Sequence, residues 1–230
     1  MAKILVALLA FATLAPAGAD ESMDAHMRGH FTTATLMQTA VIQADLETLR
    51  QQAQWLVQHP APPDMPIGFS VFLENLHANA RAAAAAETLA DAAMAVAKTA
   101  ASCGACHAQG AAQTWLDSDV LPPGGETESQ RMARHQWAAD RLWEGLIAPS
   151  DQAWLNAAEV LLEAPLALTG TRDTEQTMAL TERVHSLGQQ ARSAARSSDR
   201  VRIYAEILGT CADCHQRLRE QTGKDSPAQG

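Results

Sequence analysis

Apolar residues recur every three or four positions through most of the chain, a spacing that places them along one face of a helix. Turn-favouring residues separate eight such segments, and no segment shows the alternation of a β-strand. The pattern therefore predicts an all-α protein. Its expected helices span 22–43, 46–59, 68–85, 88–109, 127–147, 151–163, 174–196 and 199–221.

A break in the pattern divides these segments into two groups of four. It contains Pro122-Pro123-Gly124-Gly125, residues that interrupt helices and favour turns. We therefore predict a first domain over 20–115, a linker over 116–126 and a second domain over 127–222. A disordered tail is expected over 223–230.

The two halves repeat the same functional residue types in the same order. The three extra residues of the second half fall between helices, where insertions are tolerated best. A duplication of four helices per copy predicts two tandem antiparallel four-helix bundles. With an offset of 105, Met27 and His30 match Met132 and His135; with an offset of 108, Cys103-x-x-Cys106-His107 matches Cys211-x-x-Cys214-His215.

The first residues have the pattern of a secretory signal peptide. Lys3 precedes an apolar run over 4–14, and the small residues Ala17-Gly18-Ala19 follow as a cleavage site. The run is shorter than the roughly 20 apolar residues that cross a bilayer. We therefore expect segment 1–19 to be removed, leaving a soluble periplasmic protein with no membrane insertion.

The chain is acidic, with a formal net charge of −9. Lys3 leaves with the signal peptide, and the rest of the charge divides evenly. Residues 20–115 hold 9 acidic and 4 basic side chains and residues 116–230 hold 17 and 12, so each half carries −5. This balance argues against a nucleic-acid partner. It fits either simple solubility or electrostatic steering toward a basic redox partner.

All four cysteines lie in the two Cys-x-x-Cys-His motifs. Each pair of thiols can form thioethers to the vinyl groups of a haem, and the adjacent histidine can bind its iron from the same helical turn. A redox disulfide would lack its usual βαβ context, and a zinc site would have to draw ligands from separate domains. We therefore predict two covalently attached haem c groups, held by Cys103, Cys106, His107, Cys211, Cys214 and His215.

With these motifs near the end of the fourth helix of each half, the chain resembles the cytochrome c-prime family and its six-coordinate relatives, which are four-helix-bundle c-type cytochromes. The resemblance covers nearly the whole mature chain and implies that His107 and His215 are the proximal iron ligands. Family members usually carry a basic residue four positions later. Arg219 fits that pattern and Ala111 does not, so the two haem pockets are expected to differ. Related bundles often pair through their first two helices, so the resemblance is also compatible with a homodimer, although no residue here demonstrates one.

In that family the first helix supplies the residue on the distal side of the iron. An open iron can bind small gases, whereas a six-coordinate iron mainly carries electrons. Both first helices here place a methionine and a histidine one turn apart on the buried face. A buried imidazole without a partner costs about 1–3 kcal/mol, and iron would remove that cost. We therefore predict His30 and His135 as distal ligands, with Met27 and Met132 as the alternative.

The remaining histidines rank lower as ligands. His77 and His185 share the offset of 108 but lie at the flank of their helices. His26 and His30 form an i, i+4 pair capable of binding a metal ion, although Arg131 replaces His26 in the second half. Large rings that exclude water from haem pockets are expected at Trp55, Trp137, Trp143 and Trp154.

Together these features predict a periplasmic di-haem c-type cytochrome that carries electrons between other redox proteins of the periplasm. The alternative is a gas-binding or sensing haemoprotein with one five-coordinate iron. The first haem pocket is the expected place for it, because Ala111 stands where family members usually carry a basic residue after the motif histidine. No further acid, base or metal cluster accompanies the haem motifs, so we do not expect an enzyme.

Overall fold

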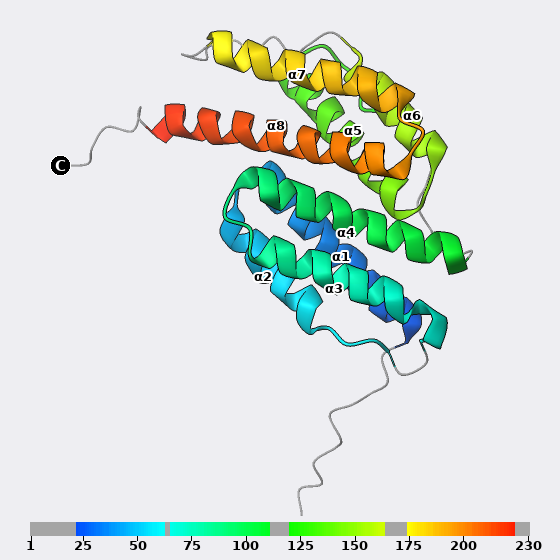
Figure 1. Cartoon of the computed structure of the whole chain (residues 1–230). Coiled ribbons are helices and arrows are strands. Elements are labelled where there is room, and N and C mark those ends of the chain that lie inside the picture. The colour runs from blue at the N-terminus through cyan, green and yellow to red at the C-terminus, as the bar shows by residue number, and fades with distance from the viewer. Residues whose placement is uncertain (1–21, 63–64, 111–119, 164–173, 224–230) are drawn as a thin grey trace, which may run out of the picture.

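The computed structural model describes residues 22–62, 65–110, 120–163 and 174–223, and every regular element in these ranges is a helix (Figure 1). Each of the eight predicted helices is present, with ends that differ from the prediction by at most three residues. The all-α class is therefore confirmed. The helices are α1 (Met23–Ile42), α2 (Leu46–Gln58), α3 (Ser70–Ala84), α4 (Leu89–Gly110), α5 (Glu128–Ile147), α6 (Asp151–Leu161), α7 (Thr174–Ser193) and α8 (Ser197–Gly223), with a 3-10 turn, η1 (Ile67–Phe69), before α3.

Polar capping residues explain where several helices begin. The side chains of Ser22, Asp45, Thr127 and Ser150 each accept a hydrogen bond from the backbone N–H three residues later. At the start of α5, Thr127 and Gln130 form a reciprocal capping box. Because Asp45 and Ser150 start new helices only a few residues after α1 and α5 end, these helices turn back sharply into α2 and α6.

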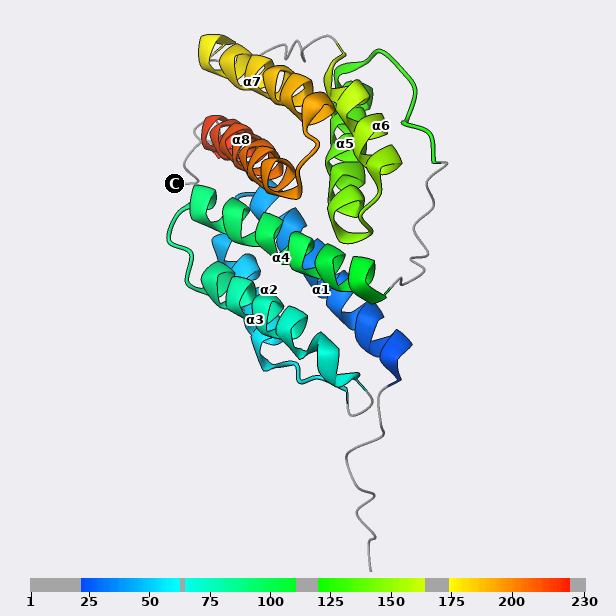
Figure 2. The ribbon, with the colours of Figure 1, turned by 45° about the vertical axis from the view of Figure 1, so that its right-hand side comes forward.

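Within each half, the helices pack in sequence order. Helix α1 contacts α2, α2 contacts α3, α3 contacts α4, and α4 returns against α1. The second half repeats this order from α5 to α8, and α8 contacts α5. Figures 1 and 2 show the two groups stacked, with α4 and α8 side by side between them. Helix α8 also contacts α1, and α4 contacts α5, so the first and last helices of each half form the interface.

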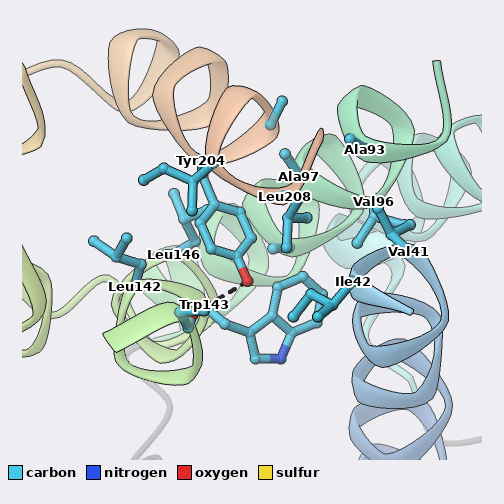
Figure 3. Close-up of a cluster of buried hydrophobic side chains, with 14 of the residues drawn as sticks. Val41, Ile42, Ala93, Val96, Ala97, Leu142, Trp143, Leu146, Tyr204 and Leu208 are labelled. Carbon is cyan, nitrogen blue, oxygen red and sulfur yellow. Dashed lines mark hydrogen bonds between the residues drawn. The ribbon is translucent and has the colours of Figure 1, made fainter. Parts of the chain in front are cut away.

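The hydrophobic core runs through this interface. Trp143 of α5 and Tyr204 of α8 are fully buried there, with ring centroids 6.1 Å apart. The Tyr204 hydroxyl donates to the carbonyl oxygen of Ala139 over 3.2 Å and accepts from Nε2 of Gln38 over 2.9 Å. Since Gln38 lies on α1, a polar contact joins the halves as well. Figure 3 shows the apolar side chains that α1, α4, α5 and α8 contribute: Val41, Ile42, Ala93, Val96, Ala97, Leu142, Trp143, Leu146, Tyr204 and Leu208.

Several predicted segments lie outside the described residues. These are the signal peptide over 1–19, the linker up to residue 119 and the tail from residue 224. The described part of the linker, 120–126, contains no helix. Among the described helices, none combines the length and the hydropathy that a membrane span requires.

Candidate functional site

A cavity in the second half brings the cysteine-histidine motif of α8 together with the predicted distal residues of α5. Cys211, Cys214 and His215 line it along with Met132 and His135. Its empty space, including the open mouth and the solvent in it, is about 490 Å³. The rest of the lining comes from α1, α5, α7 and α8: Ile42, Gln136, Ala139, Leu180, Thr181, Val184 and Thr210.

His215 is held by a residue of the first half. Its Nδ1 atom lies 2.8 Å from the carbonyl oxygen of Ile42, the last residue of α1. The last carbonyls of a helix lack intrahelical donors, so this oxygen can accept the hydrogen bond from Nδ1–H. Burial lowers the pKa of His215, which keeps the ring neutral at pH 7. Nε2 is then the ring nitrogen that can bind a metal.

His107 makes the reciprocal contact. Its Nδ1 atom lies 2.8 Å from the carbonyl oxygen of Ile147, the last residue of α5. Ile42 and Ile147 occupy equivalent positions of the two halves, with the offset of 105 that also relates the distal candidates. The histidine of each motif is therefore held by the first helix of the other half.

The two motifs differ in how closely they approach the opposite half. A Cβ at Gly104, inside the first motif, would collide with the carbonyl oxygen of Leu146 on α5. The second motif carries Ala212 at this position, and its methyl group is fully buried. Glycine thus permits a closer approach of α4 to α5 at His107 than a side chain would allow.

The cysteines are free thiols, each partly buried. Burial raises the pKa of Cys103 and of Cys211 to about 12, and it also raises the pKa of Cys106 and Cys214. Catalytic dithiol motifs instead have lowered thiol pKa values. The thiols of this chain are protonated at neutral pH, which does not favour dithiol redox chemistry.

The first half places its candidates on two helices that contact one another. Met27 and His30 lie on α1, and the motif from Cys103 to His107 lies on α4. His30 is 7% exposed, and its Nε2 atom is buried without a hydrogen-bond partner. Burial and three nearby histidines lower the pKa of His30 to about 3, so its imidazole is neutral.

His30 belongs to a cluster with His26 and His59. The ring centroid of His26 lies 4.1 Å from that of His30 and 4.9 Å from that of His59. One ligand atom from each of the three side chains lies within 4.8 Å of the others. Sequence reasoning identified the pair His26 and His30 but missed His59, because only the packing of α2 on α1 brings this residue near.

The other predicted residues have varied surroundings. Nε2 of His77 lies 3.2 Å from the backbone oxygen of His59, and Nδ1 of His185 lies 3.2 Å from the backbone oxygen of Glu163. Neither histidine lines the cavity of the second half. Trp143 and Trp154 are buried as expected. The prediction for Trp55 is wrong: this residue is 39% exposed, and one face of its ring stacks on His59.

No protein-family model matches the chain, and no curated protein or solved structure does so either.

Proposed function

We propose that this protein is a periplasmic di-haem c-type cytochrome, built from two tandem four-helix bundles, that carries electrons between redox proteins. The observation that carries the proposal is the cavity of the second half. It holds the thiols of Cys211 and Cys214 for covalent attachment, the imidazole of His215 for proximal ligation, and both distal candidates, His135 and Met132. Haem iron bound there supplies reversible one-electron exchange.

The hydrogen bonds of the motif histidines support a role in iron ligation. A metal-binding imidazole almost always donates its second N–H to a carboxylate, a backbone carbonyl or water, which fixes the ring and raises its basicity. His107 and His215 donate from Nδ1 to Ile147 and Ile42 in this way. Nε2 of each ring therefore remains for the iron.

The distal assignment stays with histidine, and methionine remains the alternative. His135 lines the same cavity as His215, and burial lowers its pKa, so its ring is neutral as a ligand must be. In the first half, the orphaned Nε2 of His30 is the matching donor atom. Met132 and Met27 lie one turn earlier on the same helices.

The acidic balance of both halves supports a basic electron-transfer partner. Each half carries a net charge of −5. A field of one sign steers an oppositely charged protein into encounter and raises the association rate, more strongly at low salt than at high salt. This charge acts on encounter rather than on the affinity of the final complex.

One observation favours a second function, gas binding at the first haem. His30 packs against His26 and His59, and a ring retained in that cluster would not reach an iron. The first haem would then be five-coordinate and open to small gases. The second haem, with His135 in its cavity, would remain an electron carrier.

The test is to express the full chain in a host that loads c-type haem and to measure its intact mass. We expect the mass of the polypeptide from Asp20 onward plus two haems, and low-spin spectra without a carbon monoxide adduct. Replacing both cysteines of one motif by serine, in either half, should leave one haem. A colourless product, or a mass without haem, would refute the proposal. A carbon monoxide adduct at half of the haem would instead establish the second function.

A further inference from the structure

Three histidines of the first half converge from two helices. His26 and His30 stand one turn apart on α1, and both are buried. His59 follows the last residue of α2 and is partly buried. Their potential ligand atoms all lie within 4.8 Å of one another. Two histidines on one helix face and a third from a neighbouring segment form a facial set of nitrogen donors.

Aromatic and backbone contacts hold His59 in this position. Trp55, one turn earlier on α2, stacks on the His59 ring with centroids 4.1 Å apart and planes 17° from parallel. Gly29 lets the indole lie against α1, since a Cβ there would come within 3.3 Å of Trp55. Nε2 of His77 on α3 lies 3.2 Å from the His59 carbonyl oxygen, to which it can donate. Contacts with three helices therefore position the third ligand.

We propose that His26, His30 and His59 bind a divalent transition-metal ion of the zinc and copper class, at a site distinct from both cysteine-histidine motifs that shares only His30 with the proposed first haem. Neutral imidazole suits zinc, copper and nickel, and three histidines leave one coordination position for water or a small anion. Bonds of about 2.0–2.1 Å place tetrahedral donors about 3.3 Å apart. The candidate donor atoms, which lie within 4.8 Å of one another, would have to move closer together to bind one ion.

Burial of an unpaired histidine nitrogen in the cluster costs free energy, and a bound metal ion would remove this cost. Nε2 of His30 is buried without a hydrogen-bond partner, and such a polar atom costs about 1–3 kcal/mol. The site belongs to the first half alone, because Arg131 stands at the position equivalent to His26. The duplicated chain thus carries two equivalent cysteine motifs but only one histidine cluster of this kind among the described residues.

Metal binding would also select the ligand of the first iron, a consequence that rests on the proposed function. His30 cannot bind both the ion and the haem iron through one Nε2 atom. An occupied cluster therefore leaves the first iron to Met27 or to a gas ligand. Binding of the ion and loading of haem are measured separately, the ion by calorimetry and the haem by intact mass.

The experiment is calorimetric titration of the chelator-treated, haem-loaded full chain with Zn²⁺ alone, repeated with Cu²⁺. We expect one ion per chain. His26→Gln and His59→Gln should each weaken binding by at least about 10-fold, the smallest loss typical of altered metal sites. His185→Gln is the matched control, because it removes one histidine outside the cluster, and it should change the affinity less than twofold. Intact mass reports the haem content of every variant, so loss of haem is not mistaken for loss of the ion.

X-ray absorption at the zinc edge gives a second measurement that needs no variant. It should show three imidazole nitrogens at about 2.0–2.1 Å in the loaded wild-type protein. Absence of saturable binding, an unchanged affinity in His59→Gln, or a zinc shell without imidazole would overturn the proposal. Two haems by mass together with no zinc binding would refute this site and leave the cytochrome function standing.

Discussion

Nδ1 of His215 on α8 lies 2.8 Å from the carbonyl oxygen of Ile42 at the end of α1, and thus joins the second motif to the first half. His107 and Ile147 repeat this contact in the opposite direction over the same distance. A hydrogen bond from the second nitrogen of a ligating imidazole raises its basicity. The electronic properties of each proposed haem should therefore depend on the packing of the two halves.

Substitution of Gly104 by alanine should change one haem only. The new methyl group would collide with the carbonyl oxygen of Leu146, so α4 and α5 must separate and the bond from His107 to Ile147 must lengthen. A weaker hydrogen bond makes the imidazole a poorer donor to ferric iron, so the first haem should show a higher reduction potential. Overpacking should also cost about 1–3 kcal/mol of unfolding free energy. Redox titration followed by visible absorption, with thermal melting, measures both effects.

Gly209→Ala is the control for Gly104→Ala. It makes the same change on α8, where a Cβ meets no atom within 4 Å. Both potentials should stay unchanged, and the fold should gain about 0.5–1 kcal/mol, because alanine favours a helix over glycine. Equal shifts at both haems, or no shift in Gly104→Ala, would show that the carbonyl contact does not tune the iron.

Substitution of His135 should open the second haem. His135 and Met132 line the same cavity, so the two side chains can be compared in one pocket. We expect His135→Ala to convert one haem from low spin to high spin, since the iron loses its sixth ligand, while Met132→Leu leaves the spectrum unchanged. Electron paramagnetic resonance of the oxidised protein separates the spin states. High spin in Met132→Leu alone would identify methionine as the ligand.

The helices could be predicted, and the cysteine motifs identified as candidate sites, because their signals are local. Caps such as Asp45 and Ser150 act on the N–H groups of the next turn, and the spacing from Cys211 to His215 is set by chemistry within one turn. These features need no knowledge of distant segments. The bounds of the helices were accordingly correct to within three residues.

The packing of the two halves against each other could not be predicted, because it has no local signal in the sequence. Every residue but proline offers the same backbone groups, so nothing in the sequence marks Ile42 as the acceptor for His215, 173 positions away. Tyr204 is fully buried, yet the helical period does not say that Gln38 on α1 of the other half contacts it. His59 falls at the end of the expected helix 46–59, and nothing in that segment points to His26 and His30, which lie on another helix.

Substitution of Asp140 by asparagine should stabilise the fold by an amount that depends on pH. Oδ1 of Asp140 accepts hydrogen bonds from Gln38 and Gln136, yet burial raises the pKa of this carboxyl above the usual 3.8. Such a carboxyl stabilises the fold fully below its unfolded pKa, and this contribution is lost as pH rises through the folded pKa. The ionised group is therefore costly at pH 7. Asp140→Asn keeps an oxygen acceptor without the charge, so it should raise the melting temperature at pH 7, by about 2–4 °C per kcal/mol gained.

The advantage of Asp140→Asn should shrink below pH 3.8, where the wild-type carboxyl is protonated in both states. Thermal melts followed by circular dichroism at pH 7 and pH 3.5 measure the difference. Glu74→Gln, which removes an exposed carboxylate on α3, serves as the control. Its melting temperature at pH 7 should equal that of the wild type. A gain of equal size at both pH values would contradict the role given to burial of the charge.

Substitution of Ala44, in the turn between α1 and α2, by glycine should stabilise the fold. The φ of Ala44, 51°, lies in the left-handed region, which costs a residue with a Cβ about 1–2 kcal/mol, whereas glycine enters it freely. Glycine also loses about 0.5–1 kcal/mol more backbone entropy on folding, so Ala44→Gly should gain up to about 1.5 kcal/mol. Ala85→Gly is the matched control, because Ala85 directly follows the last residue of α3 with an ordinary φ of −95°, and it should lower the melting temperature. Since Ile42 keeps its place beside His215, both reduction potentials should remain at their wild-type values. Equal losses of stability in the two variants would mean that the turn at Ala44 carries no strain.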